Sequence, residues 1–427
     1  MLNFFSLSTK SILVILPFAL FLSTALSDII ISLSGILIII ILWLRKEFEI
    51  FKNKYFYFFL FFCVFLLITS SLSINVKLSL ESSLFYFRFG FFVIAIVYLF
   101  KTSQNFIKYL CISFILSTSI VSIDAIYEFI FKNNFLNFLN PTNNTTTGRI
   151  SGVFGDEYIL GSYLVRLFPL TLGLLIYTYG KSFKIKIYIF FYSLLISTGI
   201  LISGERTALL MLAIIFIFTF LTFKDLRKIF TSLIISFLIL FSIFLTFDNN
   251  LKSKLLDKTF LDIYQFNSNI NIFSVQHEVV YKSSLKMFYD NKYIGIGPKI
   301  FREECKKEKY KTYTEFDRSI DGCQTHPHNT YIQILTETGI FGFIILLIPL
   351  VSLYYKIFLN LYENYFRKIE VKKILNYICL ISVFTNFWPL MPTGNFFNNY
   401  LSILYFLPIA LYFASNENLR FNSKIKK

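Results

Sequence analysis

The chain has 427 residues, of which 56% are hydrophobic and only 15% are charged. A soluble chain of this length carries about 25% charged residues and divides into roughly two or three domains, so the composition excludes an ordinary soluble enzyme. The formal net charge of +16 does not indicate nucleic-acid binding, because the lysines and arginines stand mostly at the ends of apolar runs. We therefore expect an all-α, polytopic membrane protein, with membrane lipid around it and no nucleic-acid partner.

Apolar runs of about 16 to 20 residues recur along the chain, close to the length that crosses about 30 Å of hydrocarbon. The first run is followed at once by a second, so we expect it to be a retained span and not a cleaved signal. This spacing predicts about twelve transmembrane helices. They lie at 9–27, 28–44, 55–73, 84–100, 109–129, 158–178, 187–203, 207–223, 229–247, 339–357, 374–392 and 397–414.

The distribution of positive charge predicts the orientation of these spans. When the connecting segments are assigned alternately to two sides, nearly all lysines and arginines of the short segments fall on one side. The positive-inside rule makes that side cytoplasmic and places both termini there. The chain then divides into spans one to nine (1–247), a large loop on the outer side (248–338), and spans ten to twelve with a cytoplasmic tail (339–427).

The outer loop is too long to be a simple connection. It has 91 residues, and a structureless segment of that length is unusual and points to function. Val279–Tyr289 has helical periodicity, 291–297 reads as a turn, and Thr330–Glu337 reads as a short helix that leads into the tenth span.

The few ionisable residues within or beside the spans all fall toward the outer face. Such groups are costly in a bilayer and are usually functional. They are Arg88, Asp124, Glu128, Arg166, Glu205 and Arg206. One alternative is that they form structural ion pairs, such as Arg88 with Asp124, but their one-sided clustering favours a polar cavity that opens outward beneath the loop. The adjacent Asp156 and Glu157 are expected to cap a helix.

All three histidines of the chain, His277, His326 and His328, lie in the outer loop. Random placement would achieve this roughly once in a hundred cases. Histidine changes protonation near neutral pH and is a natural general base, so the cluster indicates a site. Cys305 and Cys323 share the same loop, where we expect a disulfide. Zinc is the alternative, because Cys323 and His326 have ligand-like spacing.

Four stretches resemble the bacterial O-antigen ligase family. The pattern His, Asn, nine residues, Gly, two residues, Gly matches His328, Asn329, Gly339 and Gly342, at the end of the large loop as in that family. A second family motif, Arg followed by Leu four residues later, matches Arg206 and Leu210. Two further stretches, 149–161 and 291–302, resemble family segments that precede these motifs. The family often has an arginine near position 277, where this chain has His277.

The resemblance implies transfer of a glycan from an undecaprenyl-diphosphate carrier to an acceptor such as lipid A-core, on the periplasmic face of the bacterial inner membrane. It implies His328 as the base and Arg206 as the main cation at the pyrophosphate, with no cofactor and no metal. Arginine suits that task because its fork of N–H groups matches phosphate oxygens. Further contacts to the substrates are expected from His277, Asn329, Arg302, Arg318, Arg149, Arg166 and Arg88.

Other functions stay open at this point. An O-antigen polymerase or a protein O-oligosaccharyltransferase would use the same donor with another acceptor. A transporter of lipid-linked oligosaccharides could also have twelve spans, but its charges would be expected near the midplane between related halves. We find no internal repeat, and the polar groups lie on one side.

Overall fold

The computed structural model describes residues 2–103, 105–136, 149–263, 273–313 and 321–416. Every regular element in these ranges is a helix. The long helices are α1 (Leu2–Leu22), α2 (Thr24–Arg45), α3 (Lys54–Ser71), α5 (Arg88–Thr102), α6 (Phe106–Phe131), α7 (Leu160–Tyr179), α8 (Phe183–Ile202), α9 (Arg206–Thr222), α10 (Arg227–Phe247), α13 (Val275–Asp290), α15 (Thr330–Asn364), α16 (Val371–Asn386) and α17 (Asn399–Ser415). The short ones are α4 (Val76–Ser83), α11 (Asn249–Lys252), α12 (Lys258–Ile263), α14 (Phe301–Glu304), η1 (Phe48–Phe51), η2 (Gly152–Phe154), η3 (Lys224–Leu226), η4 (Ser253–Asp257) and η5 (Glu308–Tyr310).

Within the described part of the chain, nine helical segments are long and apolar enough to cross a membrane. Two further apolar helices, α9 and α17, have 17 residues each and reach about 26 Å. The protein is therefore a multi-pass membrane protein. Each of the twelve predicted spans contains a helix, but α16 has only 16 residues and ends at Asn386, so the count of twelve spans stays a prediction.

Some polar side chains inside the bundle form hydrogen bonds to the helices, which lowers the cost of placing them away from water. The Thr118 hydroxyl of α6 donates to the carbonyl of Phe114 one turn earlier, at 2.6 Å. The same hydroxyl lies 2.8 Å from the Tyr192 hydroxyl of α8, which joins the two helices. Such bonds pair some of the hydroxyls of the apolar helices, whereas the buried hydroxyls of Ser122, Ser193 and Ser197 have no hydrogen-bond partner among the described residues.

Helix α15 is bent at Gly339, whose φ of 64° and ψ of −170° are not helical. The bend is held by segment 291–297, whose backbone pairs with it: Gly297 N donates to Glu337 O at 2.8 Å, and Ile340 N donates to Lys292 O at 2.8 Å. A Cβ on Gly339 would collide with the backbone of Tyr293, and one on Gly342 would collide with Thr338. Gly339 thus permits close approach of backbone and Gly342 that of the Thr338 side chain. The bend turns the first part of α15 away from the spanning part.

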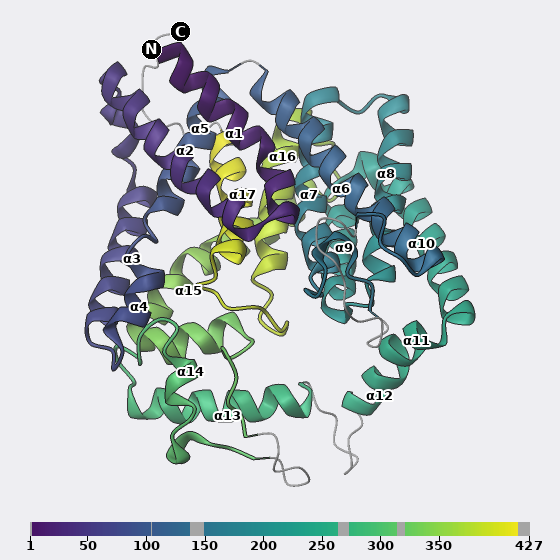
Figure 1. Ribbon diagram of the computed structural model, residues 1–427. Helices are drawn as coiled ribbons and strands as arrows, with labels where there is room; N and C mark the ends of the chain where they lie inside the picture. The colour runs from purple at the N-terminus through teal and green to yellow at the C-terminus, as the bar shows by residue number, and fades with distance from the viewer. Residues whose placement is uncertain (1, 104, 137–148, 264–272, 314–320, 417–427) are drawn as a thin grey trace.

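The predicted loop elements lie together at one end of the bundle. In Figure 1, α13, α14 and the start of α15 lie at the bottom, while the start of α1 and the end of α17 lie at the top. The helix predicted at Val279–Tyr289 is confirmed within α13. Thr336 of α15 bonds the carbonyl of Ser284 in α13 at 3.2 Å, and Asn75 beside α4 bonds the carboxylate of Glu303 at 3.0 Å. The loop is thereby packed onto the bundle.

Candidate active site

The structure brings the three histidines together although they come from separate segments. His277 lies near the start of α13, and His326 and His328 lie just before α15. The ring centroids of His326 and His328 are 4.0 Å apart, and those of His277 and His328 are 5.7 Å apart. His328 therefore stands between the other two rings.

The hydrogen bonds of the rings distinguish the three histidines. Nδ1 of His277 lies 2.6 Å from the Ser274 hydroxyl. His326 has partners at both nitrogens, with Nδ1 2.9 Å from the Thr325 hydroxyl and Nε2 3.3 Å from the carbonyl of Thr393. Among the described residues, the ring of His328 has no hydrogen-bond partner. Of the three, it is the ring with the most freedom to take a proton from a bound molecule.

The backbone at His328 is in the left-handed region, with φ at 57°, which is uncommon for a residue other than glycine. The next residue, Asn329, caps α15, and its side-chain oxygen accepts from Tyr331 N and Ile332 N at 3.0 and 3.2 Å. The helix begins at Thr330, where the sequence predicted it. The cap occupies the Asn329 oxygen, and its amide nitrogen donates to Pro389 O at 2.8 Å.

Burial keeps His326 and His328 neutral. Burial and the neighbouring His277 lower the pKa of His328 to about 4. Burial, with His328 and Arg302 nearby, lowers the pKa of His326 to about 3. A buried imidazolium loses hydration and meets no compensating carboxylate here, so the neutral ring is favoured.

Arg302 places a positive charge near the histidines. It lies in α14. Burial lowers the pKa of His326 and the charge of Arg302 adds to that shift, whereas burial raises the pKa of Glu337 and the charge of Arg302 opposes that rise. Its Nε is buried and has no hydrogen-bond partner among the described residues. Lys299 is close as well, because Arg302 also lowers the pKa of that amine. Arg318, the other predicted donor contact in this part of the loop, lies outside the described residues.

Arg206 belongs to a second polar group, at the turn between α8 and α9. It is the first residue of α9, and its exposed side chain bonds the Thr259 hydroxyl of α12 at 3.4 Å. The preceding Glu205 accepts from Gly161 N at 2.7 Å and Ser162 N at 3.2 Å. This carboxylate therefore caps α7, whereas the prediction that Asp156 or Glu157 caps a helix is wrong, because α7 begins at Leu160 without a side-chain cap from either.

Two other predicted arginines surround Glu205. The positive charges of Arg149 and Arg166 both act on its carboxyl group. Arg166 is buried in α7 and bonds the hydroxyl of Ser162, while exposed Arg149 lies over the ring of Tyr158 at 5.9 Å. The turn therefore gathers cations around one carboxylate. Their role toward a substrate stays a prediction.

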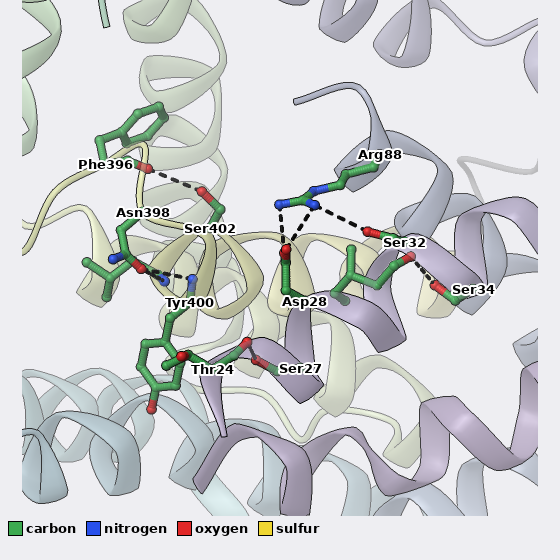
Figure 2. A network of polar contacts seen from close by, with 12 residues as sticks. Thr24, Ser27, Asp28, Ser32, Ser34, Arg88, Phe396, Asn398, Tyr400 and Ser402 are labelled. Carbon is green, nitrogen blue, oxygen red and sulfur yellow. Dashed lines mark hydrogen bonds and ion pairs between the residues drawn. The ribbon is translucent and has the colours of Figure 1, made fainter. Parts of the chain in front are cut away.

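Arg88 has a structural partner that sequence reasoning placed wrongly. Its guanidinium reaches Asp28 of α2 at 2.6 Å and bonds Ser32 at 3.2 Å, and Figure 2 shows it turned toward both. Asp124 instead accepts from Leu136 N at 3.1 Å, and Glu128 accepts from Gly152 N at 2.7 Å. The acidic residues of α6 thus hold the backbone at Leu136 and Gly152, and the suggested pair of Arg88 with Asp124 is wrong.

The segment between α16 and α17, residues 387–398, touches the histidines and was missed in the sequence. We call it the connector. Thr393 N donates to the carbonyl of His328 at 2.8 Å, and its own carbonyl meets the His326 ring. We predicted that the eleventh span continues to 392, but the helix ends at Asn386. Pro389, Pro392 and Gly394 were the signal that this apolar stretch is not helical.

Residues 191–347 match the protein-family model described as O-antigen ligase. They are an O-antigen ligase domain. No curated protein matches the chain. Members of this family transfer glycans from lipid-linked substrates. The O-antigen ligase domain includes Arg206, the whole outer loop and the motif from His328 to Gly342. The connector lies outside the matched residues.

The cysteines of the O-antigen ligase domain's loop form a disulfide in the structure, Cys305 with Cys323, with Cα atoms 5.0 Å apart. This arrangement favours the disulfide over the zinc hypothesis, because both sulfurs are used by each other. Within the described ranges, no group of three or more His, Cys, Asp or Glu side chains is arranged to hold a metal. The disulfide closes the segment that leads from α14 to the histidines.

Proposed function

We propose that the protein transfers an undecaprenyl-diphosphate-linked glycan to an acceptor sugar such as lipid A-core on the periplasmic face of the inner membrane, as an O-antigen ligase. The observation that carries this proposal is the neutral, centrally placed His328 beside His277 and His326, with Arg302 next to them. A base beside a phosphate-binding cation is what glycosyl transfer from a lipid pyrophosphate requires.

In the proposed step, a hydroxyl oxygen of the acceptor attacks the anomeric carbon of the donor sugar. The bond between that carbon and the phosphate oxygen breaks, and its electron pair leaves with the pyrophosphate. His328 takes the hydroxyl proton at a ring nitrogen. One carbon–oxygen bond forms and one breaks, so no oxidant or other co-reactant is needed.

The low pKa of His328 is compatible with its role as the base in this step. A neutral ring is ready to accept a proton, but a pKa of about 4 makes it a weak base when the site holds no anion. Binding of the pyrophosphate brings negative charge close to the ring and raises its pKa toward neutrality. We propose that the base gains strength only once the donor is bound, which limits the abstraction of protons from other molecules.

The cations have separate tasks in this proposal. Arg302 holds the pyrophosphate beside the histidines, because its half-buried guanidinium already acts on His326. Arg206 begins α9, where backbone N–H groups also favour an anion, and we propose that it contacts the same pyrophosphate from the side of α12. Arg149 and Arg166 support that turn through Glu205.

The alternatives differ in the acceptor. An O-antigen polymerase adds the glycan to another carrier-linked glycan, and a protein O-oligosaccharyltransferase adds it to a hydroxyl of a protein. Both use the same base and the same cations, so the geometry serves all three, and the spacing of the histidine motif favours the ligase. A transporter would release the donor glycan unchanged.

The test uses purified protein in lipid vesicles with carrier-linked glycan and lipid A-core. We expect wild-type protein to release carrier pyrophosphate and extend the core. His328→Ala should reduce transfer at least about a thousandfold, whereas His326→Ala, whose ring is held by Thr325 and Thr393, should reduce it about tenfold. Transfer by His328→Ala at a rate close to wild type would refute the base assignment, and unaltered glycan appearing across the vesicle membrane would support the transporter.

A further inference from the structure

Thr393 of the connector contacts the residues around His328 at three points. Its N–H donates to the carbonyl of His328, its carbonyl meets Nε2 of His326, and its hydroxyl lies 3.0 Å from the Thr330 hydroxyl. The last contact is buried. Thr393 therefore contacts the ring of His326, the backbone of His328 and the first residue of α15.

A polar ladder on α15 holds the connector in place. Asn329, Gln333 and Glu337 are spaced four residues apart and so lie on one face of the helix. Gln333 is fully buried. Its amide nitrogen donates to Asn395 at 2.8 Å and to Glu337 at 2.9 Å, and its oxygen accepts from Phe396 N at 2.9 Å.

The ladder also joins the connector to the loop. The carboxylate of Glu337 accepts from Phe301 N at 3.4 Å, next to Arg302. Gln333 thus stands between the segment that carries Arg302 and the segment that carries Thr393. Each hydrogen bond is buried, so the loss of one partner leaves the other unsatisfied.

We propose that the connector forms part of the active site together with α13 and the segment before α15. Gln333 and Thr393 are positioning residues, which hold His328 in its left-handed backbone conformation facing His277. This inference rests on the proposed function for the role of His328, but the geometry it describes is independent of that role. The family match ends at residue 347, so the match assigns nothing to the connector.

The positioning has a physical reason. A residue other than glycine at a φ of 57° is strained, and such strain persists only where surrounding contacts fix it. The contact from Thr393 N is directly on the carbonyl of His328. The Thr393 hydroxyl holds that N–H in place through its contact with the Thr330 hydroxyl. When Thr393 shifts, as we expect without this contact, His328 relaxes toward negative φ, which turns its ring away from His277 and into water.

The titratable groups that face His328 come from three elements. Among the described residues, His277 of α13 and His326 have rings next to that of His328, Tyr281 of α13 contacts the ring of His277, and Arg302 of α14 acts through His326. None of these side chains belongs to the connector. A variant of the connector therefore changes the position and hydration of His328 without removing a neighbouring charge.

The experiment compares Gln333→Leu, Thr393→Val and Thr393→Ser, with Thr385→Val as the matched control. Thr385 is buried near the end of α16, two residues before the connector, and its hydroxyl donates to the carbonyl of Ile381 within its own helix, at 2.8 Å. Thr393→Val is the less disruptive substitution. If Gln333→Leu fails to insert into the membrane, the measurements are made on Thr393→Val. All variants are purified in lipid vesicles as the full chain.

Two quantities are measured: the kinetics of transfer, and the rate at which diethyl pyrocarbonate modifies His328 at pH 7, located by peptide mass spectrometry. For Gln333→Leu we expect a kcat about tenfold lower, with KM for the donor changed less than about twofold. His328 should react about tenfold faster because water reaches the ring. Thr393→Val should show the same changes at about threefold, while Thr393→Ser and Thr385→Val stay at wild-type values.

The outcomes separate this inference from the proposed function. An unchanged rate of modification at His328 in Gln333→Leu and Thr393→Val would overturn the positioning role, whatever the activity. Loss of activity in Thr393→Ser equal to that in Thr393→Val would overturn the role of the hydroxyl. If His328→Ala still transfers glycan, the base assignment fails, but faster modification of His328 in the connector variants would still support positioning by the connector.

Discussion

At the scale of single residues, burial of the ionisable groups determines their protonation state in the site. The pKa of His328 falls because its charged form would lose hydration beside His277. Sequence reasoning found the three histidines because they are the only ones in the chain. It could not find the partner of Arg88, since pairing between distant helices is not encoded in hydropathy, and it named Asp124 where the structure has Asp28.

The low pKa of His328 predicts the pH dependence of transfer. A base must be neutral, so activity is present above its pKa and is lost as the pH falls through it. With the pKa at about 4, kcat/KM should change less than about twofold between pH 8 and about pH 5.5. A steep fall beginning near pH 6.5, the ordinary range of histidine, would show that His328 is not held in this environment.

Arg302 is expected to bind the donor through its planar fork. Arg302→Lys keeps the charge but loses paired hydrogen bonds, so KM for the carrier-linked donor should rise about tenfold, and Arg302→Gln should raise it further. Arg318→Gln is the comparison, because both arginines were predicted contacts. A larger effect of Arg318→Gln than of Arg302→Gln would reverse the assignment.

At the scale of elements, the bent α15 carries the motif. The sequence indicated both of its parts, a short helix at Thr330–Glu337 and a span from 339, and the structure joins them at Gly339. The purpose of the glycines was not visible in the sequence, because it depends on segment 291–297 lying against the bend. The connector was missed for a similar reason. Because its residues are mostly apolar, its first part was predicted to be the end of the eleventh span.

The bend predicts that an alanine at position 339 is far more harmful than one at a comparable glycine. Gly339 has φ 64° and Gly180 has φ 78°, so alanine is strained at both, by about 1 to 3 kcal/mol. Only at Gly339 does the added methyl group also collide with backbone, while at Gly180 it meets nothing within 4 Å. Gly339→Ala should abolish transfer and lower the thermal stability of the detergent-solubilised protein clearly more than Gly180→Ala; equal effects would argue against the packed bend.

The disulfide predicts a local effect on the loop. It closes a segment with a sequence separation of 18, for which the chain-entropy model gives about 3 kcal/mol. Cys305→Ser with Cys323→Ser should therefore speed limited proteolysis between α14 and α15 without altering membrane insertion. Free thiols at both positions in the non-reduced, purified protein would contradict the pairing.

At the scale of the whole molecule, hydropathy and charge were enough to predict a helical bundle with its chemistry at one end. Figure 1 places the histidine-bearing segments at the end opposite the start of α1 and the end of α17. The orientation itself is a prediction from the positive-inside rule. The arrangement of helices around the site could not be predicted, because nothing in the periodicity says which helices pack together.

The orientation is tested with two single cysteines. Lys306→Cys lies on the exposed surface of the loop, and Lys46→Cys lies at the exposed end of α2. In intact spheroplasts, a membrane-impermeant maleimide should label Lys306→Cys and spare Lys46→Cys until the membrane is broken. The reverse pattern would place the loop in the cytoplasm. The proposed substrates, which lie on the periplasmic face, could then not bind to it.

The most direct measurement of the central claim is made in the cell. The gene is deleted and replaced by wild type or by His328→Ala, and lipopolysaccharide is resolved on a gel beside an immunoblot of carrier-linked glycan. We predict that the ladder of glycan on the core is present with wild type, and that it disappears with His328→Ala while carrier-linked polymer accumulates. A core that keeps a single repeat would indicate a polymerase, and an unchanged ladder with His328→Ala would contradict the account.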